Sequence, residues 1–491
     1  MKKCFFLSIL FSVFSLAACQ AATTAQSTKT SQVELKACQL SAPGFTRHVS
    51  AQCGKLEVYE DRLSGSGRKI SLHLAVIPAV SRSPEPDPLF FLAGGPGEAA
   101  TQSFMAIYSA LSRINQKRDI ILVDQRGTGG SHFLGCPEGN QEDVEVETDA
   151  VEIRQYLQHC LAELDADPRL YTTSIAMDDL DEVRQALGYD QINLYGASYG
   201  TRAALVYARQ HGDHLRTMIL DGVVPLDWTL GPAVAGDAQR ALNLLFKRCT
   251  GDATCQAAFP NLEQDFETVL QRLREKPISI TLIHPSRGDE INYTLKLETF
   301  INTIHIFSYT QETAALLPLL IHQAAVQEDY RPLAAQSLIT TESLASLMSP
   351  GMRFSVLCSE DVPFMTDSPT STGYFGDWFL VSLKQICETW PSGAIPADFK
   401  QPVQSNTPTL LISGEADPVT PPQNGEQAAR TLPNSLHIVV PSQGHINIFR
   451  GCIPKIAATF VESASVSNLD TACVQEIEPM PLFINFNGPQ P

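Results

Sequence analysis

The sequence is 491 residues long, 44% hydrophobic and 18% charged, as expected of a globular chain with one large domain and an inserted second one. Its formal net charge of −18 disfavours nucleic acids and anionic membrane surfaces as partners, because both are bound by basic patches. None of the 11 histidines begins an H-E-x-x-H sequence and no Cys/His cluster has zinc-finger spacing, so neither a metal site nor a cofactor is predicted.

The N-terminus is typical of an export signal, predicted over residues 1–18. Lys2 and Lys3 precede an apolar run at 5–14 that is too short to span a bilayer and continue. The Leu-Ala-Ala-Cys sequence ending at Cys19 resembles a bacterial lipobox, in which the cysteine receives a diacylglycerol and becomes the first mature residue. Residues 19–36 would then tether a protein anchored in the cell envelope, facing the periplasm or the surface. The alternative is ordinary signal cleavage and a free soluble protein.

The ten cysteines beyond this segment are an even number in an exported chain, which predicts disulfides. The sequence leaves their connectivity open, and each bridge would contribute about 2 to 4 kcal/mol. The simplest pairing joins neighbours along the chain: Cys38 with Cys53, Cys136 with Cys160, Cys249 with Cys255, Cys358 with Cys387, and Cys452 with Cys473.

Alternating strand and helix patterns begin near residue 70, and two apolar runs there predict buried strands. The run at 88–92 opens into Ala-Gly-Gly-Pro-Gly. If the chain has a serine nucleophile, as the motif described next indicates, the backbone N–H of Gly95 is the expected donor to the oxyanion that its attack creates. This loop lacks the lysine of a phosphate-binding loop and the spacing of a dinucleotide fingerprint, which disfavours nucleotide binding. The run at 120–123 leads to Asp124 and Arg126, predicted to pair with each other and to tie loops together, in a structural role.

The pentapeptide Gly-Ala-Ser-Tyr-Gly, centred on Ser198, lies between a strand-like run at 192–195 and a helix-like run at 201–210. This context predicts a nucleophile elbow, in which a tight strand-turn-helix exposes the serine and tolerates only small residues two positions to either side. The backbone N–H of Tyr199 would be the second oxyanion donor. The alternative is an ordinary glycine-rich turn.

Two later loops supply an acid and a histidine in the order that such an elbow requires. An apolar run at 409–413 ends in a loop carrying Asp417, with Glu415 as a second candidate acid. The next predicted strand, 436–440, leads to His445. The alternatives are a helix N-cap for Asp417 and an ordinary loop histidine for His445.

The pattern becomes largely helical between the two groups of strands. Amphipathic stretches at 261–275 and 312–327 indicate helices, so an inserted helical cap is predicted at 227–400. The predicted fold is therefore an α/β core, with a mostly parallel sheet and helices on both faces, made by residues 37–226 and 401–491.

Four stretches together resemble the proline iminopeptidase and tripeptidyl aminopeptidase group of the α/β-hydrolase superfamily. They are the Gly-Gly-Pro-Gly loop at 94–97, preceded by Ala93 where many relatives have histidine, the Asp-Gln-Arg-Gly loop at 124–131, the elbow at 195–200 and the acid loop at 414–421. The resemblance implies a serine peptidase with the catalytic triad Ser198, Asp417 and His445. It also implies an acidic motif for the substrate's free ammonium group, which we place in a loop at Glu360 and Asp361. The alternative for these two is that they are solvated surface acids.

The predicted function is hydrolysis of peptides near a free N-terminus through an acyl-enzyme on Ser198. A carboxylesterase or lipase would use the same residues and is the first alternative, and a non-catalytic binding module on a hydrolase scaffold is the second. Dehalogenase and epoxide hydrolase chemistry is disfavoured, because those relatives place aspartate at the elbow.

Overall fold

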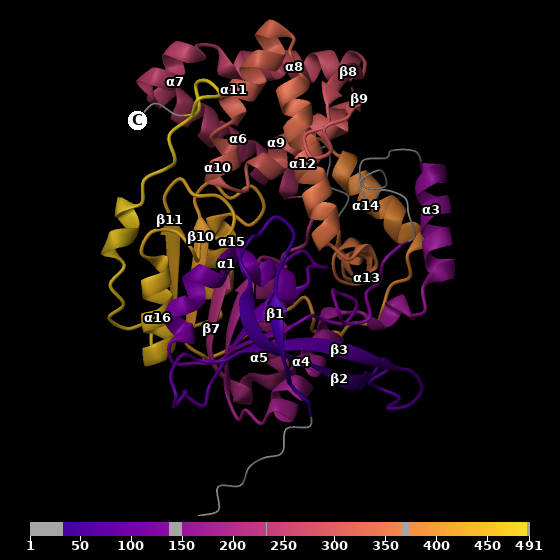
Figure 1. Cartoon of the computed structure of the whole chain (residues 1–491), viewed down its shortest axis with the longest axis vertical. Helices are drawn as coiled ribbons and strands as arrows, with labels where there is room; N and C mark the ends of the chain where they lie inside the picture. Colours follow the sequence, from indigo (N-terminus) through magenta and orange to yellow (C-terminus); the bar gives the residue numbers. More distant parts are fainter. Residues whose placement is uncertain (1–32, 137–149, 232, 366–372, 489–491) are drawn as a thin grey trace, which may run out of the picture.

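The computed structural model describes residues 33–136, 150–231, 233–365 and 373–488 (Figure 1). The predicted signal segment, Cys19 and most of the predicted tether lie outside these residues. In the part of the chain that is described, no helix is both long and apolar enough to cross a membrane.

A single nine-stranded sheet forms the centre of the molecule, in the order β1-β2-β3-β5-β4-β6-β7-β10-β11. The first three strands run antiparallel and the other six are parallel to one another, so the mostly parallel sheet predicted from the sequence is confirmed. A separate antiparallel hairpin joins β8 to β9. The strands are β1 (Lys36–Leu40), β2 (Val49–Tyr59), β3 (Lys69–Ile77), β4 (Leu89–Leu92), β5 (Ile120–Val123), β6 (Ile192–Ala197), β7 (Leu215–Asp221), β8 (Ile278–Ile283), β9 (Glu290–Leu295), β10 (Thr409–Gly414) and β11 (Ser435–Val440).

Helices cover both faces of the sheet, and a larger group of helices gathers at one end of it (Figure 1). The helices are α1 (Ala100–Asn115), α3 (Ala150–Glu163), α4 (Thr173–Leu187), α5 (Tyr199–His211), α6 (Val234–Gly251), α7 (Ala253–Ala258), α8 (Leu262–Glu275), α9 (Leu297–Phe307), α10 (Gln311–Ala314), α11 (Leu317–His322), α12 (Arg331–Leu347), α13 (Pro350–Glu360), α14 (Trp378–Thr389), α15 (Pro422–Ala429) and α16 (Ile453–Ser463).

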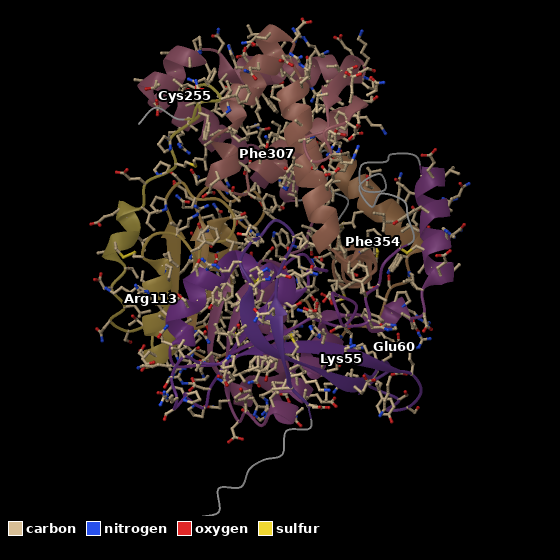
Figure 2. All side chains as sticks on the ribbon, viewed as in Figure 1. Lys55, Glu60, Arg113, Cys255, Phe307 and Phe354 are labelled. Atoms are coloured by element: carbon tan, nitrogen blue, oxygen red, sulfur yellow. A yellow bond between two sulfur atoms is a disulfide. The ribbon has the colours of Figure 1, made fainter. Side chains whose placement is uncertain are left out.

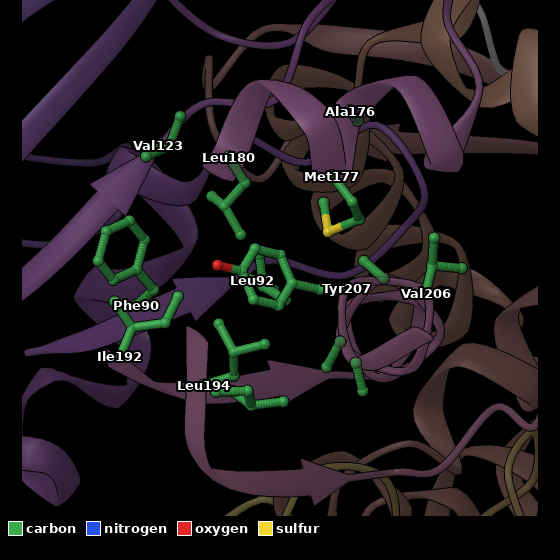
Figure 3. Packing of buried hydrophobic residues seen from close by; sticks show 14 of the residues in the cluster. Phe90, Leu92, Val123, Ala176, Met177, Leu180, Ile192, Leu194, Val206 and Tyr207 are labelled. Atoms are coloured by element: carbon green, nitrogen blue, oxygen red, sulfur yellow. The ribbon is translucent and has the colours of Figure 1, made fainter. Parts of the chain in front are cut away.

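The continuous apolar run of β4 is explained by burial on both sides of the sheet. Phe90 and Leu92 pack with side chains of α4 and α5 (Figure 3), whereas Leu89 and Phe91 pack with those of α1 and α16. Successive side chains of a strand point to opposite faces, so a strand covered by helices on both faces needs apolar residues at every position.

The predicted cap region, between β7 and β10, contains two hydrophobic clusters rather than one. Helices α6 to α12 and the β8-β9 hairpin share the first cluster, which includes Phe307 (Figure 2). Helix α13 and the second half of α14 pack against α3, where Phe354 lies edge-on to Trp390 with ring centroids 5.4 Å apart, whereas Trp378 and Phe379 at the start of α14 pack against the first cluster. The C-terminal segment also returns to the first cluster, since the Phe483 N–H donates to the Ala315 carbonyl at 3.0 Å.

The ten cysteines in the described residues form five disulfides, and their pairing is the nearest-neighbour pairing of the sequence analysis. Two of them lie in the cluster formed by α3, α13 and α14. Cys136–Cys160 joins α3 to the segment at 133–136, and Cys358–Cys387 joins α13 to α14. A five-disulfide framework is typical of an exported protein, because thiols stay reduced in the cytosol.

Two predictions of local structure are wrong. The predicted helix at 312–327 is interrupted: α10 and α11 are separate, with Pro318 in the first turn of α11, and a π-helical turn follows at Gln323–Gln327. Proline has no N–H to donate to a preceding turn, so it begins a helix more readily than it continues one.

Asp124 and Arg126 do not pair with each other, contrary to the prediction. The Asp124 carboxylate accepts the Thr101 N–H and hydroxyl at 2.9 Å, at the start of α1. The Arg126 guanidinium points the other way and makes a two-pronged contact with Asp179 of α4 at 2.6 and 2.9 Å. Each charge therefore ties the loop to a different helix.

Gly414, at the end of β10, is expected to be intolerant of any side chain. A Cβ there would collide with the carbonyl oxygens of Gln443 and Gly444, in the loop that leads to His445. We expect Gly414→Ala to destabilise the fold by about 3 kcal/mol or more, the upper end for overpacking, because the backbone must shift. Thermal unfolding measures this. Gly236→Ala is the matched control: it meets nothing within 4 Å on the exposed side of α6, and should be neutral or stabilising.

Candidate active site

Ser198 occupies the sharp turn between β6 and α5, with φ 53° and ψ −121°. This left-handed backbone is strained for a residue other than glycine, a feature that concentrates at functional sites. A Cβ on Gly196 would collide with the Gly200 carbonyl oxygen, and one on Gly200 would collide with the Leu92 carbonyl oxygen. The close approach of these backbones explains why both flanking glycines are needed.

Asp417 and His445 are in direct contact in neighbouring loops after β10 and β11. Asp417 Oδ2 lies 2.7 Å from His445 Nδ1, and both residues are buried. The other carboxylate oxygen of Asp417 accepts the N–H groups of Val419 and Thr420, each at 2.8 Å. The acid is therefore held in place by its own loop while it faces the imidazole.

The two groups shift each other's pKa in the directions that favour an ion pair. Burial would lower the pKa of His445, but the charge of Asp417 and the hydrogen bond between them outweigh burial and raise it above 6.5. Burial would likewise raise the pKa of Asp417, but the His445 charge and the backbone donors keep it below 3.8. Asp417 thus stays ionised and stabilises a proton on His445.

The end of β7 brings the serine and histidine loops together. The Ser198 N–H donates to the Asp221 carbonyl at 2.9 Å, and the Asp221 carboxylate accepts the N–H groups of Asn447 and Ile448 at 2.8 to 2.9 Å. A Cβ on Gly222 would lie 2.9 Å from His445 Cε1. The buried Asp221 has a pKa raised to about 6, because burial disfavours its charge more than its donors favour it.

The predicted oxyanion loop lies against the nucleophile. A Cβ on Gly94 would be 3.4 Å from Ser198 Cβ, and Gly95 has φ +103°. Tyr199 is the first residue of α5, so its N–H belongs to the first turn of the helix, whose N–H groups have no partner within the helix. The loop of Gly94 and Gly95 therefore lies next to Ser198, and α5 begins directly after the serine.

Glu360 and Asp361 do not lie in an exposed loop, and this part of the prediction is wrong. Glu360 is the last residue of α13, and Asp361 follows it directly; both are fully buried. Arg202 of α5 makes a two-pronged contact with Asp361 at 2.7 and 2.9 Å, while Glu360 accepts the Thr173 N–H at 2.7 Å and its hydroxyl at 2.8 Å. They fasten α13 to the helix that follows the nucleophile, so they are not the solvated acids of the alternative interpretation either.

The pKa values of the two carboxylates are shifted in opposite directions. Burial raises the pKa of Glu360 to about 7, whereas for Asp361 the contact with Arg202 outweighs burial and lowers the pKa. Arg202 and Asp361 form a buried ion pair, so removing either one would leave an uncompensated charge in the interior.

Several side chains around the site were not predicted. The backbone carbonyl of Tyr309 accepts the backbone N–H of His445 at 2.6 Å. The rings of the two residues meet edge-on with centroids 5.2 Å apart. His305 lies 5.3 Å from the Tyr309 ring, and burial lowers its pKa to about 3, so it is neutral. Arg240 of α6 donates to the Glu415 and Asp417 carbonyls at 2.6 Å each. No sequence motif marks these residues, because their position depends on how the helices after β7 dock.

Glu415, the second candidate acid, points away from His445. Its side chain is exposed and accepts the Ser442 N–H at 2.8 Å. Among the described residues there is also no group of three or more histidine, cysteine, aspartate or glutamate side chains placed to hold a metal ion.

Comparison with known proteins identifies the class. A family described as the alpha/beta hydrolase fold matches residues 87–276, and a family described as TAP-like protein matches residues 372–473. The chain is 23% identical to the putative hydrolase YuaR of Escherichia coli K12 over 89% of this chain and 90% of that one. It is 25% identical to the serine protease Hip1 of Mycobacterium tuberculosis H37Rv over 87% and 88% of the two chains.

A shorter match is to the tripeptidyl aminopeptidase of Streptomyces coelicolor, at 29% identity over 35% of each chain. The sheet topology, the elbow and these matches together define a serine hydrolase. The chain therefore has the α/β-hydrolase fold, and its C-terminal part is similar to the TAP-like family.

Proposed function

We propose that this chain is an exported serine aminopeptidase that hydrolyses peptides near a free N-terminus. The observation that carries the proposal is the 2.7 Å contact between Asp417 and His445 beside a strained Ser198 elbow. Support for a peptidase, rather than an esterase, comes from relatives named serine protease, tripeptidyl aminopeptidase and proline iminopeptidase.

In the proposed mechanism, His445 accepts the Ser198 proton as the serine oxygen attacks the scissile carbonyl. Asp417 orients the imidazole and stabilises the imidazolium, while the N–H groups of Gly95 and Tyr199 bind the tetrahedral oxyanion. The imidazolium then gives its proton to the departing amine, and a water molecule, deprotonated by the same histidine, releases the acyl group. No step requires a metal or an organic cofactor.

The helical region between β7 and β10 is the proposed cap that selects the substrate. Its contacts with the acid and histidine loops, through Arg240 and Tyr309, support this role. Glu360 and Asp361 already bind Thr173 and Arg202, so they are better suited to holding α13 in place than to binding a substrate ammonium group.

Substrate assays test the proposal directly. We expect the purified protein to hydrolyse aminoacyl or tripeptidyl arylamides with a free N-terminus, and to lose most of this activity when the same substrates are N-acetylated. Hydrolysis of p-nitrophenyl esters without any arylamide cleavage would establish an esterase instead. Failure to react with a fluorophosphonate would indicate a non-catalytic binding module.

We also propose that the protein is a lipoprotein attached to the cell envelope through Cys19, as the lipobox-like sequence indicates. Incorporation of a radioactive fatty acid tests this proposal, with Cys19→Ser as the comparison. Equal labelling of both proteins, or none in either, would rule out the anchor and favour ordinary signal cleavage.

A further inference from the structure

Glu98 is a carboxylate beside the nucleophile that has no part in the proposed triad. One point in space, where a Cβ on Gly94 would be, lies 3.4 Å from Glu98 Oε1 and 3.4 Å from Ser198 Cβ. The other oxygen of Glu98 accepts the Ser103 hydroxyl at 2.8 Å. Among the described residues, no lysine or arginine is paired with it. Glu98 Oε1 is thus no more than 6.8 Å from Ser198 Cβ, and this carboxylate has no basic partner among the described residues.

We propose that Glu98 binds the free α-ammonium group of the residue that is acylated onto Ser198, so that the enzyme releases one N-terminal residue at a time. This inference rests on the proposed function. It moves the binding of the ammonium group from Glu360 and Asp361, where the sequence placed it, to the oxyanion loop itself.

The distances favour an ammonium group on the acylated residue itself. In such a residue the nitrogen lies about 2.5 Å from the carbonyl carbon, from standard bond lengths. That carbon waits about 3 Å from the serine oxygen before attack. The nitrogen therefore lies within about 6 Å of Ser198, a distance at which it can reach Glu98 Oε1. The ammonium group of a tripeptidyl substrate would lie two residues, or about 7 Å, farther away when extended.

The segment after α12 covers the same loop and limits its space. Glu98 and Met348 form an isolated antiparallel bridge, and the Ser349 N–H donates to the Gly97 carbonyl at 2.9 Å. The Met348 sulfur would be 3.1 Å from a Cβ on either Gly95 or Gly97. The segment therefore occupies space beside Glu98, which favours a short acyl group against this loop.

Electrostatics make Glu98 selective as well as attractive. A fixed negative charge beside an oxyanion site disfavours a substrate that brings no positive charge, because the developing oxyanion is repelled. An ammonium group between the two anions removes that repulsion and forms a charge-assisted hydrogen bond with Glu98. Substrates with a free N-terminus are therefore favoured over blocked ones at the same site.

The competing interpretation is that Glu98 only stabilises the start of α1. It lies two residues before that helix and accepts a hydrogen bond from Ser103 in its first turn. Two variants separate the interpretations. Glu98→Gln keeps an acceptor for Ser103 but removes the charge, and Ser103→Ala removes the hydrogen bond but keeps the charge.

The experiment compares the p-nitrophenyl esters of alanine and of propionate, which differ only in the ammonium group. The measured quantity is the ratio of kcat/KM for alanine to that for propionate, after subtraction of spontaneous hydrolysis. We expect Glu98→Gln to lower this ratio about 10- to 100-fold, the size of a lost charge-assisted contact. Ser103→Ala should keep the ratio within about twofold of the unchanged protein.

An unchanged ratio in Glu98→Gln, or an equal fall in Ser103→Ala, would overturn the proposal. A larger fall in Asp237→Asn would also overturn it, because Asp237 would then be the carboxylate that binds the ammonium group. Asp237 is a half-buried residue of α6, and burial and the charge of Asp417 raise its pKa to about 6. Because both substrates are esters, the result can be read even if the protein cleaves no amide. Failure of the peptidase proposal would instead appear as absent arylamide cleavage.

The number of residues released is tested separately with unchanged protein. We expect alanine arylamide to be cleaved at least about tenfold more efficiently than trialanine arylamide, because only the former places its ammonium group at Glu98. Preference for the tripeptide would overturn the one-residue assignment.

Discussion

Replacing Ser198 with alanine is expected to lower kcat by about 10⁴- to 10⁶-fold and to abolish covalent labelling by a fluorophosphonate. The serine oxygen is the proposed nucleophile, whereas the other hydroxyl of the elbow, that of Tyr199, is buried and hydrogen-bonded to Thr173 at 2.7 Å. Hydrolysis of an arylamide measures the first effect, and gel fluorescence after labelling measures the second.

Ser174→Ala is a suitable control for the nucleophile. Ser174 is a buried serine of α4, and its backbone carbonyl, not its hydroxyl, accepts from Gln210. Turnover and labelling should therefore stay close to those of the unchanged protein. Labelling that persists in Ser198→Ala would show that another residue is the nucleophile, and the proposed mechanism would have to be abandoned.

Replacing Asp417 with asparagine is expected to lower kcat by about 10³- to 10⁴-fold while leaving the fold intact. Asparagine has nearly the same shape but no charge. Its amide oxygen would replace Asp417 Oδ1 as acceptor of the Val419 and Thr420 N–H groups, so its NH2 group would face His445, which loses its acceptor and the anion that stabilises its protonated form. Steady-state kinetics measure the loss, and thermal unfolding checks the fold.

The pH dependence of kcat/KM provides a second readout for the same variant. His445 must be neutral to accept the serine proton, so activity rises as pH increases through its pKa. That pKa is raised in the unchanged protein, chiefly by Asp417 acting against burial. In Asp417→Asn the rising limb should therefore move to lower pH.

Glu415→Gln is the matched control for the acid, since Glu415 lies two residues away in the same loop and is exposed. It should retain nearly full activity and an unchanged pH profile. If Glu415→Gln lost as much activity as Asp417→Asn, or if the limb of Asp417→Asn did not move, Asp417 would not be the acid that supports His445.

The sheet and the glycine-rich elbow were predictable from the sequence because their causes are local. The run at 88–92 is apolar at every position because helices bury both faces of β4, and this pattern is visible without coordinates. Gly196 and Gly200 are required by backbone contacts within one turn and the adjacent strand. The disulfides follow the same logic, because each joins cysteines that are near neighbours along the chain.

The surroundings of the site were not predictable, because they depend on how distant elements dock. Arg126 follows Asp124 by two residues, yet the turn between them sends the two charges to α4 and α1. Glu360 and Asp361 look like surface acids in the sequence, but Arg202 and Thr173, more than 150 residues earlier, bury and satisfy them.

The same distinction applies to the residues proposed to act in catalysis. The order of a serine, an acid and a histidine after strand-like runs indicated Ser198, Asp417 and His445. Local patterns contain no information about Tyr309 against His445 or Glu98 beside Ser198. The contact of Tyr309 exists only after the helices beyond β7 fold over the end of the sheet, whereas Glu98 lies near Ser198 because β4 and β6 are neighbours in the sheet. In both cases packing between separate elements decides which polar groups share one low-dielectric site.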